Sequence, residues 1–268
     1  MSSDYPHLSP TIEVLAGTDV DDVWDRFEIF EALHHSMQIC NPMDSSELNE
    51  VIEAFGLSGG EHVYDAACGF GELLIRCAEK TAIAGTGVDL SPWMVTGAVD
   101  EAERRVPNAD LRWELGEARD YLPEPRPDVA VCIGAEWVWH DFTGTARALS
   151  QQVAPGGVVA IAAARLRHGA DQAAVTANHG TVETVDDMAA TLQRFGLVPV
   201  HRVDPTDDGW DGYLARTAVA VEQWRQLYPG DRAERWASEQ RDWQAARDRD
   251  RHITGWSVWV AHKARASA

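Results

Sequence analysis

The most chemically specific part of this sequence is a glycine-rich turn that follows an acidic residue. Asp65 ends a short apolar run, and Gly69 and Gly71 follow it where a helical pattern begins. Two glycines around one residue let the backbone approach a ligand closely, and the helix start offers unpaired N–H groups to an anion. A carboxylate beside this turn can accept a hydrogen bond from an ammonium group. The turn therefore favours an amino-acid-containing ligand over a bare dinucleotide, which has no ammonium.

Two common nucleotide-binding motifs fail at this turn. Counted from Gly69, the pattern is Gly-x-Gly-x-x-Leu, so Leu74 stands where the dinucleotide fingerprint requires its third glycine. No Gly-Lys-Ser/Thr follows, which excludes a Walker motif. An acid does follow at the spacing that reaches ribose hydroxyls, because Asp89 ends the run Gly87–Asp89. The sequence predicts nucleoside binding and disfavours a nicotinamide-dependent oxidoreductase.

Further features in the same order make the pattern more specific. Ser91-Pro92 is a helix cap with proline at the first helical position, Glu117 follows a third apolar run, and Pro155–Gly157 precedes a fifth. This ordered set resembles the class I S-adenosylmethionine-dependent methyltransferases, whose first motif is (D/E)xGxGxG. Ala67 stands at the first glycine of that motif. Phe27–Pro42 together with Asp65–Arg76 resembles a bacterial small-molecule branch of this family.

The resemblance implies S-adenosyl-L-methionine as cofactor and S-adenosyl-L-homocysteine as product. It implies that Leu90 and Met94 lie against the adenine, and that Glu117 receives the adenine amino group where the family usually has aspartate. The cofactor-binding residues that it implies are Asp65, Ala67, Cys68, Gly69, Gly71, Asp89, Leu90, Met94, Glu117, Ala118, Ile133 and Gly134.

The remaining sequence predicts the elements that position these residues. Short apolar runs that alternate with helical patterns predict βαβ units and a parallel sheet. We expect strands at 62–67, 85–89, 110–114, 128–133, 158–163, 197–203 and 257–263, and helices at 19–36, 44–55, 72–80, 92–105, 142–153 and 184–195. The predicted fold is α/β, a Rossmann-like class I methyltransferase sheet, mostly parallel with an antiparallel last strand and helices on both faces. We expect an N-terminal helical lid over 1–60, and an α/β domain over 61–268 with a helical insertion at about 205–255.

Candidate catalytic residues follow the fourth predicted strand of the domain, since ligands bind beyond the carboxyl ends of strands in open α/β sheets. Methyl transfer requires alignment of the acceptor, and a general base only where the acceptor must lose a proton. Histidine side chains in general change charge near neutral pH, so His140 is the first candidate for such a base, with Asp141 or Glu136 to orient or replace it. The alternative is that Asp141 only begins the next helix and His140 lies exposed beside it.

The candidate residues for binding the methyl acceptor are aromatic or imidazole side chains that we expect near the carboxyl ends of the strands. Trp137 and Trp139 could form an aromatic wall, or could pack into the core. His34 and His35 end the first predicted helix and could form an active-site lip or a solvated helix end. Cys40 lies near this pair, but no second cluster has metal-ligand spacing, so we expect no metal site.

The overall composition restricts the partners. The 268 residues carry a formal net charge of −20 without a run of Lys or Arg, which argues against nucleic acid and anionic membranes. The apolar runs are too short to span a bilayer, the first residues lack a signal-peptide pattern, and four unpaired cysteines suit a reducing compartment. We therefore expect a cytoplasmic enzyme that can form a homodimer and that methylates a small molecule such as a secondary metabolite. The alternative is a non-methylating cofactor-binding protein or a partner subunit with the same fold.

Overall fold

The structure, a computed structural model, describes residues 8–175 and 182–265. These residues form an eight-stranded sheet in the order β1-β4-β3-β2-β5-β6-β8-β7. Strands β1 to β6 pair in parallel, and β8 runs antiparallel to both of its neighbours, β6 and β7. The predicted mostly parallel sheet with an antiparallel last strand is confirmed. The strands are β1 (Ile12–Val14), β2 (His62–Ala66), β3 (Ala84–Asp89), β4 (Asp110–Leu115), β5 (Val129–Cys132), β6 (Val158–Leu166), β7 (Leu197–Val203) and β8 (Thr254–Lys263).

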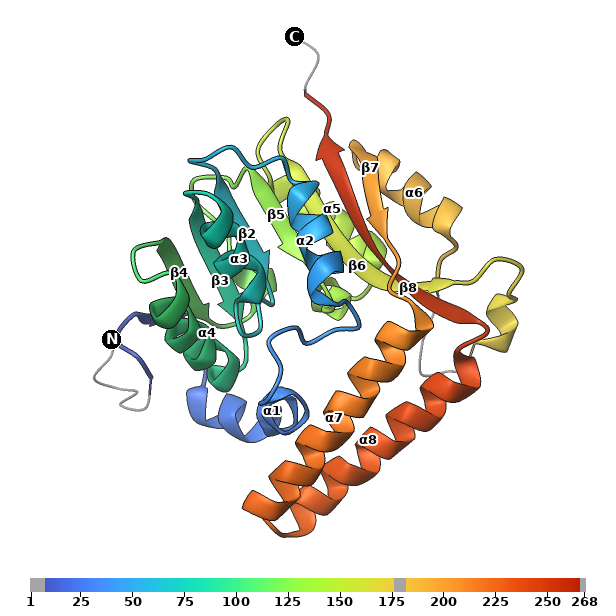
Figure 1. The fold of residues 1–268 in the computed structure, drawn as a ribbon. Coiled ribbons are helices and arrows are strands. Elements are labelled where there is room, and N and C mark those ends of the chain that lie inside the picture. The colour runs from blue at the N-terminus through green and yellow to red at the C-terminus, as the bar shows by residue number, and fades with distance from the viewer. Residues whose placement is uncertain (1–7, 176–181, 266–268) are drawn as a thin grey trace.

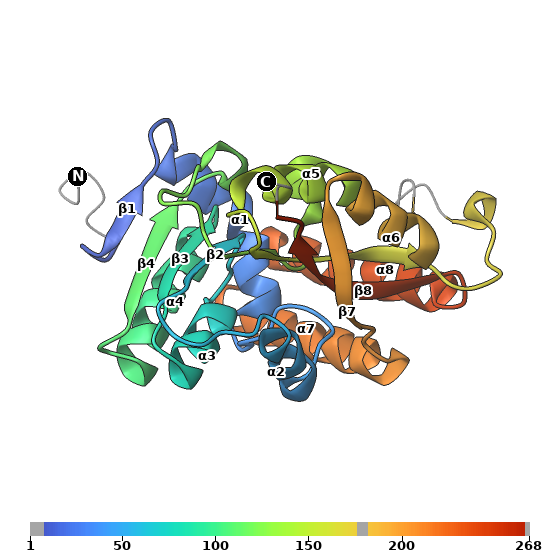
Figure 2. The same ribbon diagram turned by 90° about the horizontal axis from the view of Figure 1, so that it is seen from above.

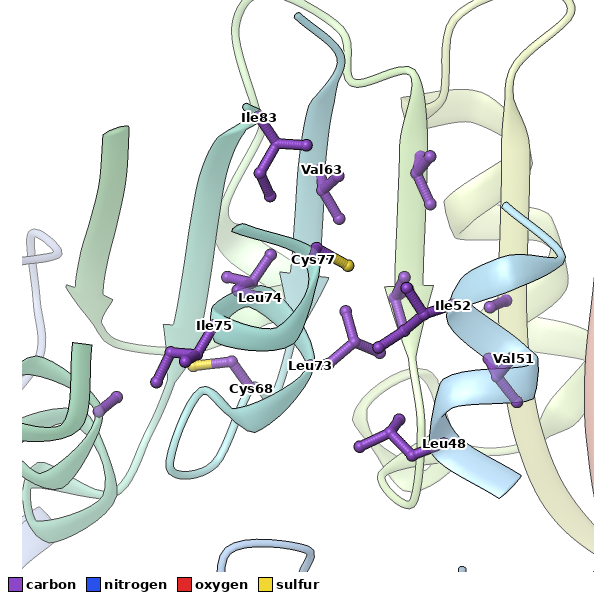
Figure 3. Close-up of a cluster of buried hydrophobic side chains, with 14 of the residues drawn as sticks. Leu48, Val51, Ile52, Val63, Cys68, Leu73, Leu74, Ile75, Cys77 and Ile83 are labelled. Atoms are coloured by element: carbon purple, nitrogen blue, oxygen red, sulfur yellow. The ribbon is translucent and has the colours of Figure 1, made fainter. Parts of the chain in front are cut away.

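Helices cover both faces of the sheet (Figure 2). One face carries α2 (Ser45–Glu53), α3 (Glu72–Lys80) and α4 (Pro92–Arg105), and the other carries α5 (Phe142–Gln152) and α6 (Val185–Arg194). α3 and α2 lie side by side on this face of the sheet, and Leu74, Val63 and Ile52 are buried in the core beneath and between them (Figure 3). Complete burial of each such side chain stabilises the fold by roughly 1.5–3 kcal/mol. This packing fixes α3, and with it the glycine-rich turn that begins it.

Capping residues fix where the helices begin. Asp44 and Glu47 form a reciprocal capping box at the start of α2. Ser91 accepts a hydrogen bond from the Met94 N–H, and Pro92 is the first residue of α4. These starts agree with the cap residues in the sequence.

Residues 8–60 contain a strand in addition to two helices, and the role of the N-terminal segment as a lid stays a prediction. Ile12–Val14 is a strand that pairs in parallel with β4, and α2 packs against α3 and β7. Of the two helices in residues 8–60, α1 (Val20–His34) is the one that lies across the carboxyl-terminal side of the strands, toward which the arrowheads of β2 to β5 point in Figure 1. A three-residue strand is too short for its alternation to stand out in the sequence.

The polar segment before the last strand is a helical hairpin. It consists of α7 (Asp207–Leu227) and α8 (Asp231–Asp250), which extend beside α1 below the sheet edge (Figure 1). Trp224 and Trp236 of the hairpin pack with Ala32 of α1. At its base, Arg247 is buried and pairs with Asp207 at 2.8 Å. The predicted helical insertion therefore attaches to the sheet and to α1.

Among the helices of the described residues, none is both long and apolar enough to cross a bilayer.

Candidate functional site

The site lies where the loops after β2 and β3 meet. The Asp89 carboxylate, at the end of β3, accepts the Gly69 N–H at 2.9 Å and the Ser91 N–H at 2.8 Å. One carboxylate thus ties the glycine-rich turn to the start of α4. Burial raises the pKa of Asp89, and these backbone donors lower it in part.

The two glycines of the turn have different roles. Both have positive φ, +54° at Gly69 and +73° at Gly71, a region that favours glycine. Gly69 faces open space, since a Cβ there would meet only the Met94 sulfur at 3.6 Å. A Cβ at Gly71 would lie 2.3 Å from the ring of Trp113. Gly69 therefore keeps the backbone accessible to a ligand, whereas Gly71 allows α3 to begin against a buried ring.

Asp65, near the end of β2, has a buried carboxyl group. Its side chain is 5% exposed, and no group among the described residues donates a hydrogen bond to it. Burial, followed by the nearby charge of Asp89, raises the pKa of Asp65 to about 8. Such a group is stabilised in its charged form by a cation brought next to it. The ammonium of a methionine moiety is a cation of this kind.

Two adjoining cavities open around this turn. The smaller, of about 70 Å³, includes Asp65, Cys68 and Asn41 in its wall. The larger, of about 250 Å³, includes Asp89. Both are lined by Cys40, Ala67, Gly69 and Ile133, so they are neighbouring parts of one site.

The residues that the sequence associates with the cofactor gather in these two walls. The larger cavity is lined by Leu90, Met94, Glu117, Ala118 and Gly134 in addition to Asp89. Gly71 is the exception, since it lines neither cavity and acts through the start of α3. The arrangement fits S-adenosylmethionine with its amino-acid end at Asp65 and its nucleoside end at Asp89.

The four predicted acceptor residues separate into two groups. His34 and Trp137 line the larger cavity. Trp139 packs against the core on the α5 side of the sheet, because the short 3₁₀ helix Glu136–Trp139 turns the two tryptophans to different sides. His35 lies at 6.2 Å from the ring of Trp224, and its Nδ1 lies 3.3 Å from the Glu31 carbonyl oxygen. The pairs therefore do not form a continuous wall or lip.

The three predicted catalytic residues lie outside both cavities. His140 is exposed, with φ of +78°. Asp141 caps α5 by accepting the Gly144 N–H at 2.6 Å. Glu136 is half-buried, and burial raises its pKa. Asp141 thus begins a helix, as in the alternative interpretation of the sequence, and His140 lies exposed beside it.

Several cavity residues were not predicted from the sequence. Phe27 and Phe30 of α1 line the larger cavity with His34, and Tyr213 of α7 and Trp243 of α8 join them. The spacing of Phe27, Phe30 and His34 along one helical face is a signal that could have identified the first two. Nothing in the sequence places the hairpin residues beside them.

Comparisons with known proteins agree with this geometry. A family model described as a methyltransferase domain matches residues 63–157. A methyltransferase from Geobacter sulfurreducens, solved with S-adenosyl-L-homocysteine, is 26% identical with a TM-score of 0.79 over 87% of this chain and 97% of that one. One from Thiobacillus denitrificans, solved with the same ligand, is 27% identical with a TM-score of 0.78 over the same shares. The uncharacterized protein YjhP of Escherichia coli is 26% identical over 215 residues, 78% of this chain and 86% of its own length. All three likenesses extend well beyond the matched domain.

Proposed function

The chain is a class I S-adenosylmethionine-dependent methyltransferase, and from this premise we propose that it methylates a small aromatic or heteroatom-bearing molecule. When bound, the cofactor supplies an electrophilic methyl group on a positively charged sulfur. The chain's own residues hold the cofactor and align the acceptor, as expected for an in-line displacement. Asp65 pairs with the ammonium group, and Asp89 takes the ribose hydroxyls while it holds both loops together.

The observation that carries this proposal is the continuity of the cofactor cavity with an aromatic wall. Asp89 and Gly69 belong to the same 250 Å³ cavity as Phe27, Phe30 and Trp137. Aromatic faces bind flat or apolar molecules and exclude water from the reacting atoms. A small acceptor is therefore favoured over a protein or nucleic-acid segment. The net charge of −20 also opposes a nucleic-acid substrate.

Finer assignments stay predictions. We propose a cytoplasmic location, which the four free cysteines support, and we also propose a role in secondary metabolism. A homodimer stays a prediction as well. A base at His140, aided by Asp141 or Glu136, also stays a prediction, and their positions outside the cavities do not support it.

Thermal unfolding distinguishes the proposed cofactor class directly. A ligand that binds only the folded state raises the free energy of unfolding, by about 2.7 kcal/mol at a ligand concentration one hundred times its Kd. The unfolding temperature rises with it. We expect S-adenosylmethionine and S-adenosylhomocysteine to raise this temperature and NAD(H) to leave it unchanged. Stabilisation by NAD(H) alone would contradict the assignment. Labelled-methyl transfer to a small-molecule panel then separates an enzyme from a protein that only binds the cofactor.

Cofactor affinity is expected to depend on pH through Asp65. The pKa of this carboxyl is about 8 in the ligand-free protein, and pairing with an ammonium lowers it. Binding then releases a proton, so S-adenosylhomocysteine affinity falls as pH falls below about 8, by up to about tenfold per pH unit. Titration calorimetry in buffers of different ionisation enthalpy measures the released proton. The Asp65→Asn variant is the control, since it should release none; a proton released equally by this variant would assign the effect elsewhere.

A further inference from the structure

A buried hydrogen bond joins the N-terminal helix to the hairpin at the wall of the larger cavity. The His34 Nε2 lies 2.9 Å from the Tyr213 hydroxyl oxygen. The two side chains are 4% and 6% exposed, and both line the cavity. Their rings stack with centroids 6.0 Å apart. The His34–Tyr213 pair thus places polar atoms in a cavity wall that also contains aromatic rings.

The protonation of the other ring nitrogen of His34, Nδ1, decides which of the two side chains donates this hydrogen bond. His34 Nδ1 lies 2.9 Å from the Phe30 carbonyl oxygen, which can only accept. Nδ1 must therefore carry a proton. Burial lowers the pKa of His34 to about 4, so the ring is neutral near pH 7 and its Nε2 is an acceptor. It follows that the Tyr213 hydroxyl donates to Nε2.

A tyrosine hydroxyl that has donated its single proton can only accept further hydrogen bonds. Burial also raises the pKa of Tyr213, so the phenol stays protonated and the direction is kept. Its remaining lone pairs are available to a ligand in the cavity. Cys40 and Asp89 line this cavity together with Tyr213. Tyr213 therefore lines the same cavity as the cofactor-binding residue Asp89.

We propose that Tyr213 binds the methyl acceptor by accepting a hydrogen bond from its nucleophilic O–H or N–H, and that His34 is a positioning residue that fixes the direction of the Tyr213 hydroxyl. This inference rests on the proposed function and narrows its substrates to hydroxyl compounds and primary or secondary amines. Acceptors without hydrogen on the nucleophilic atom, such as tertiary amines and alkenes, are disfavoured. In the reaction the acceptor heteroatom bonds to the methyl carbon, the carbon–sulfur bond breaks with its electron pair on sulfur, and the acceptor proton leaves to solvent.

The first test does not require a known acceptor. In ¹⁵N-labelled protein at pH 7, we expect the His34 imidazole to give the shifts of a neutral ring protonated at Nδ1, with Nε2 unprotonated. The His34→Gln variant assigns these signals. A ring protonated at Nε2, or a doubly protonated ring at pH 7, would overturn the proposal because Tyr213 would then be free to donate to the ligand.

The second test uses labelled-methyl transfer to phenol, aniline, N-methylaniline and N,N-dimethylaniline. We expect transfer to the compounds that carry O–H or N–H and none to N,N-dimethylaniline. Tyr213→Phe should lower kcat/KM by about tenfold, the typical effect of one lost hydrogen bond, with the Kd for S-adenosylhomocysteine unchanged. His34→Leu should show the same loss, and His34→Gln should recover most of it, because its amide oxygen can accept at the Nε2 position.

Tyr228→Phe is the matched control, since Tyr228 is an exposed tyrosine at the end of α7 that lines neither cavity. Equal kcat/KM for Tyr213→Phe and wild type, or equal transfer to N-methylaniline and N,N-dimethylaniline, would overturn the role of the pair and leave methyl transfer standing. Failure of every acceptor while S-adenosylhomocysteine still binds would contradict the proposed function, and this inference with it.

Discussion

Asp65→Asn is expected to make the ligand-free protein more stable while weakening its cofactor binding. The folded protein holds the Asp65 proton more tightly than the unfolded chain does, since the pKa rises from 3.8 to about 8. The protonated Asp65 carboxyl therefore contributes its full share to the free energy of unfolding below about pH 4. That contribution is lost progressively as the pH rises from about 4 to about 8. Asparagine does not titrate. At pH 8 we expect a gain of ~2 kcal/mol in the free energy of unfolding, after allowance for the buried amide.

The same substitution removes the charge that pairs with the cofactor ammonium. A charge-assisted hydrogen bond contributes roughly 1.5–3 kcal/mol, so the Kd for S-adenosylhomocysteine should rise about 10- to 100-fold. Urea unfolding and calorimetry measure the two effects on one sample. Asp120→Asn, at an exposed aspartate, should change neither value. Weaker binding together with lower stability would contradict a burial penalty at Asp65 and indicate general damage to the loop.

Gly71→Ala is expected to destabilise the fold by about 2–5 kcal/mol. The left-handed conformation costs a non-glycine residue roughly 1–2 kcal/mol, and overpacking against a buried ring adds about 1–3 kcal/mol. The ring is that of Trp113, which would lie 2.3 Å from the new Cβ and is itself 4% exposed. Urea unfolding of the ligand-free protein measures this change without reference to cofactor binding.

The Gly69→Ala variant separates the backbone strain from the overpacking against Trp113. This position has a similar positive φ, +54° against +73°, but its new Cβ would be in ordinary contact with Met94. We expect a loss of only about 1–2 kcal/mol from backbone strain, with a further loss of cofactor affinity because Gly69 lines both cavities. If the two variants lose the same free energy of unfolding, the Trp113 ring must move away from the new Cβ at position 71, and the overpacking that we predict does not occur.

Local patterns in the sequence were sufficient to predict most of the sheet and the cofactor loops. The strand-to-helix turn at Asp65–Gly71 and the cap at Ser91 depend on residues adjacent in the chain, so their spacing carries the information. The structure also places Asp89 at the end of β3, where the sequence predicts that a strand ends, and its hydrogen bond to the Gly69 N–H gives a physical reason for their separation in sequence. The fold class followed because alternating strands and helices allow few arrangements.

Only His34 and Trp137 of the acceptor wall were predicted, because the rest of the wall depends on contacts between distant segments. His34 and Tyr213 are 179 positions apart, and no sequence pattern indicates that they meet. The two tryptophans after β5 illustrate a second difficulty. Trp137 lines the cavity and Trp139 packs in the core because Glu136–Trp139 is a 3₁₀ turn, whereas an extended loop would place both on one side. Such turns leave little signal in sequence periodicity.

The most direct test of this account is a crystal structure of the protein with S-adenosylhomocysteine. We predict that the ligand ammonium lies within hydrogen-bond distance of Asp65, that the ribose hydroxyls contact Asp89, and that the sulfur faces the cavity wall formed by Phe30 and Tyr213. A ligand bound in the reverse direction, or one whose ammonium lies away from Asp65, would contradict the account.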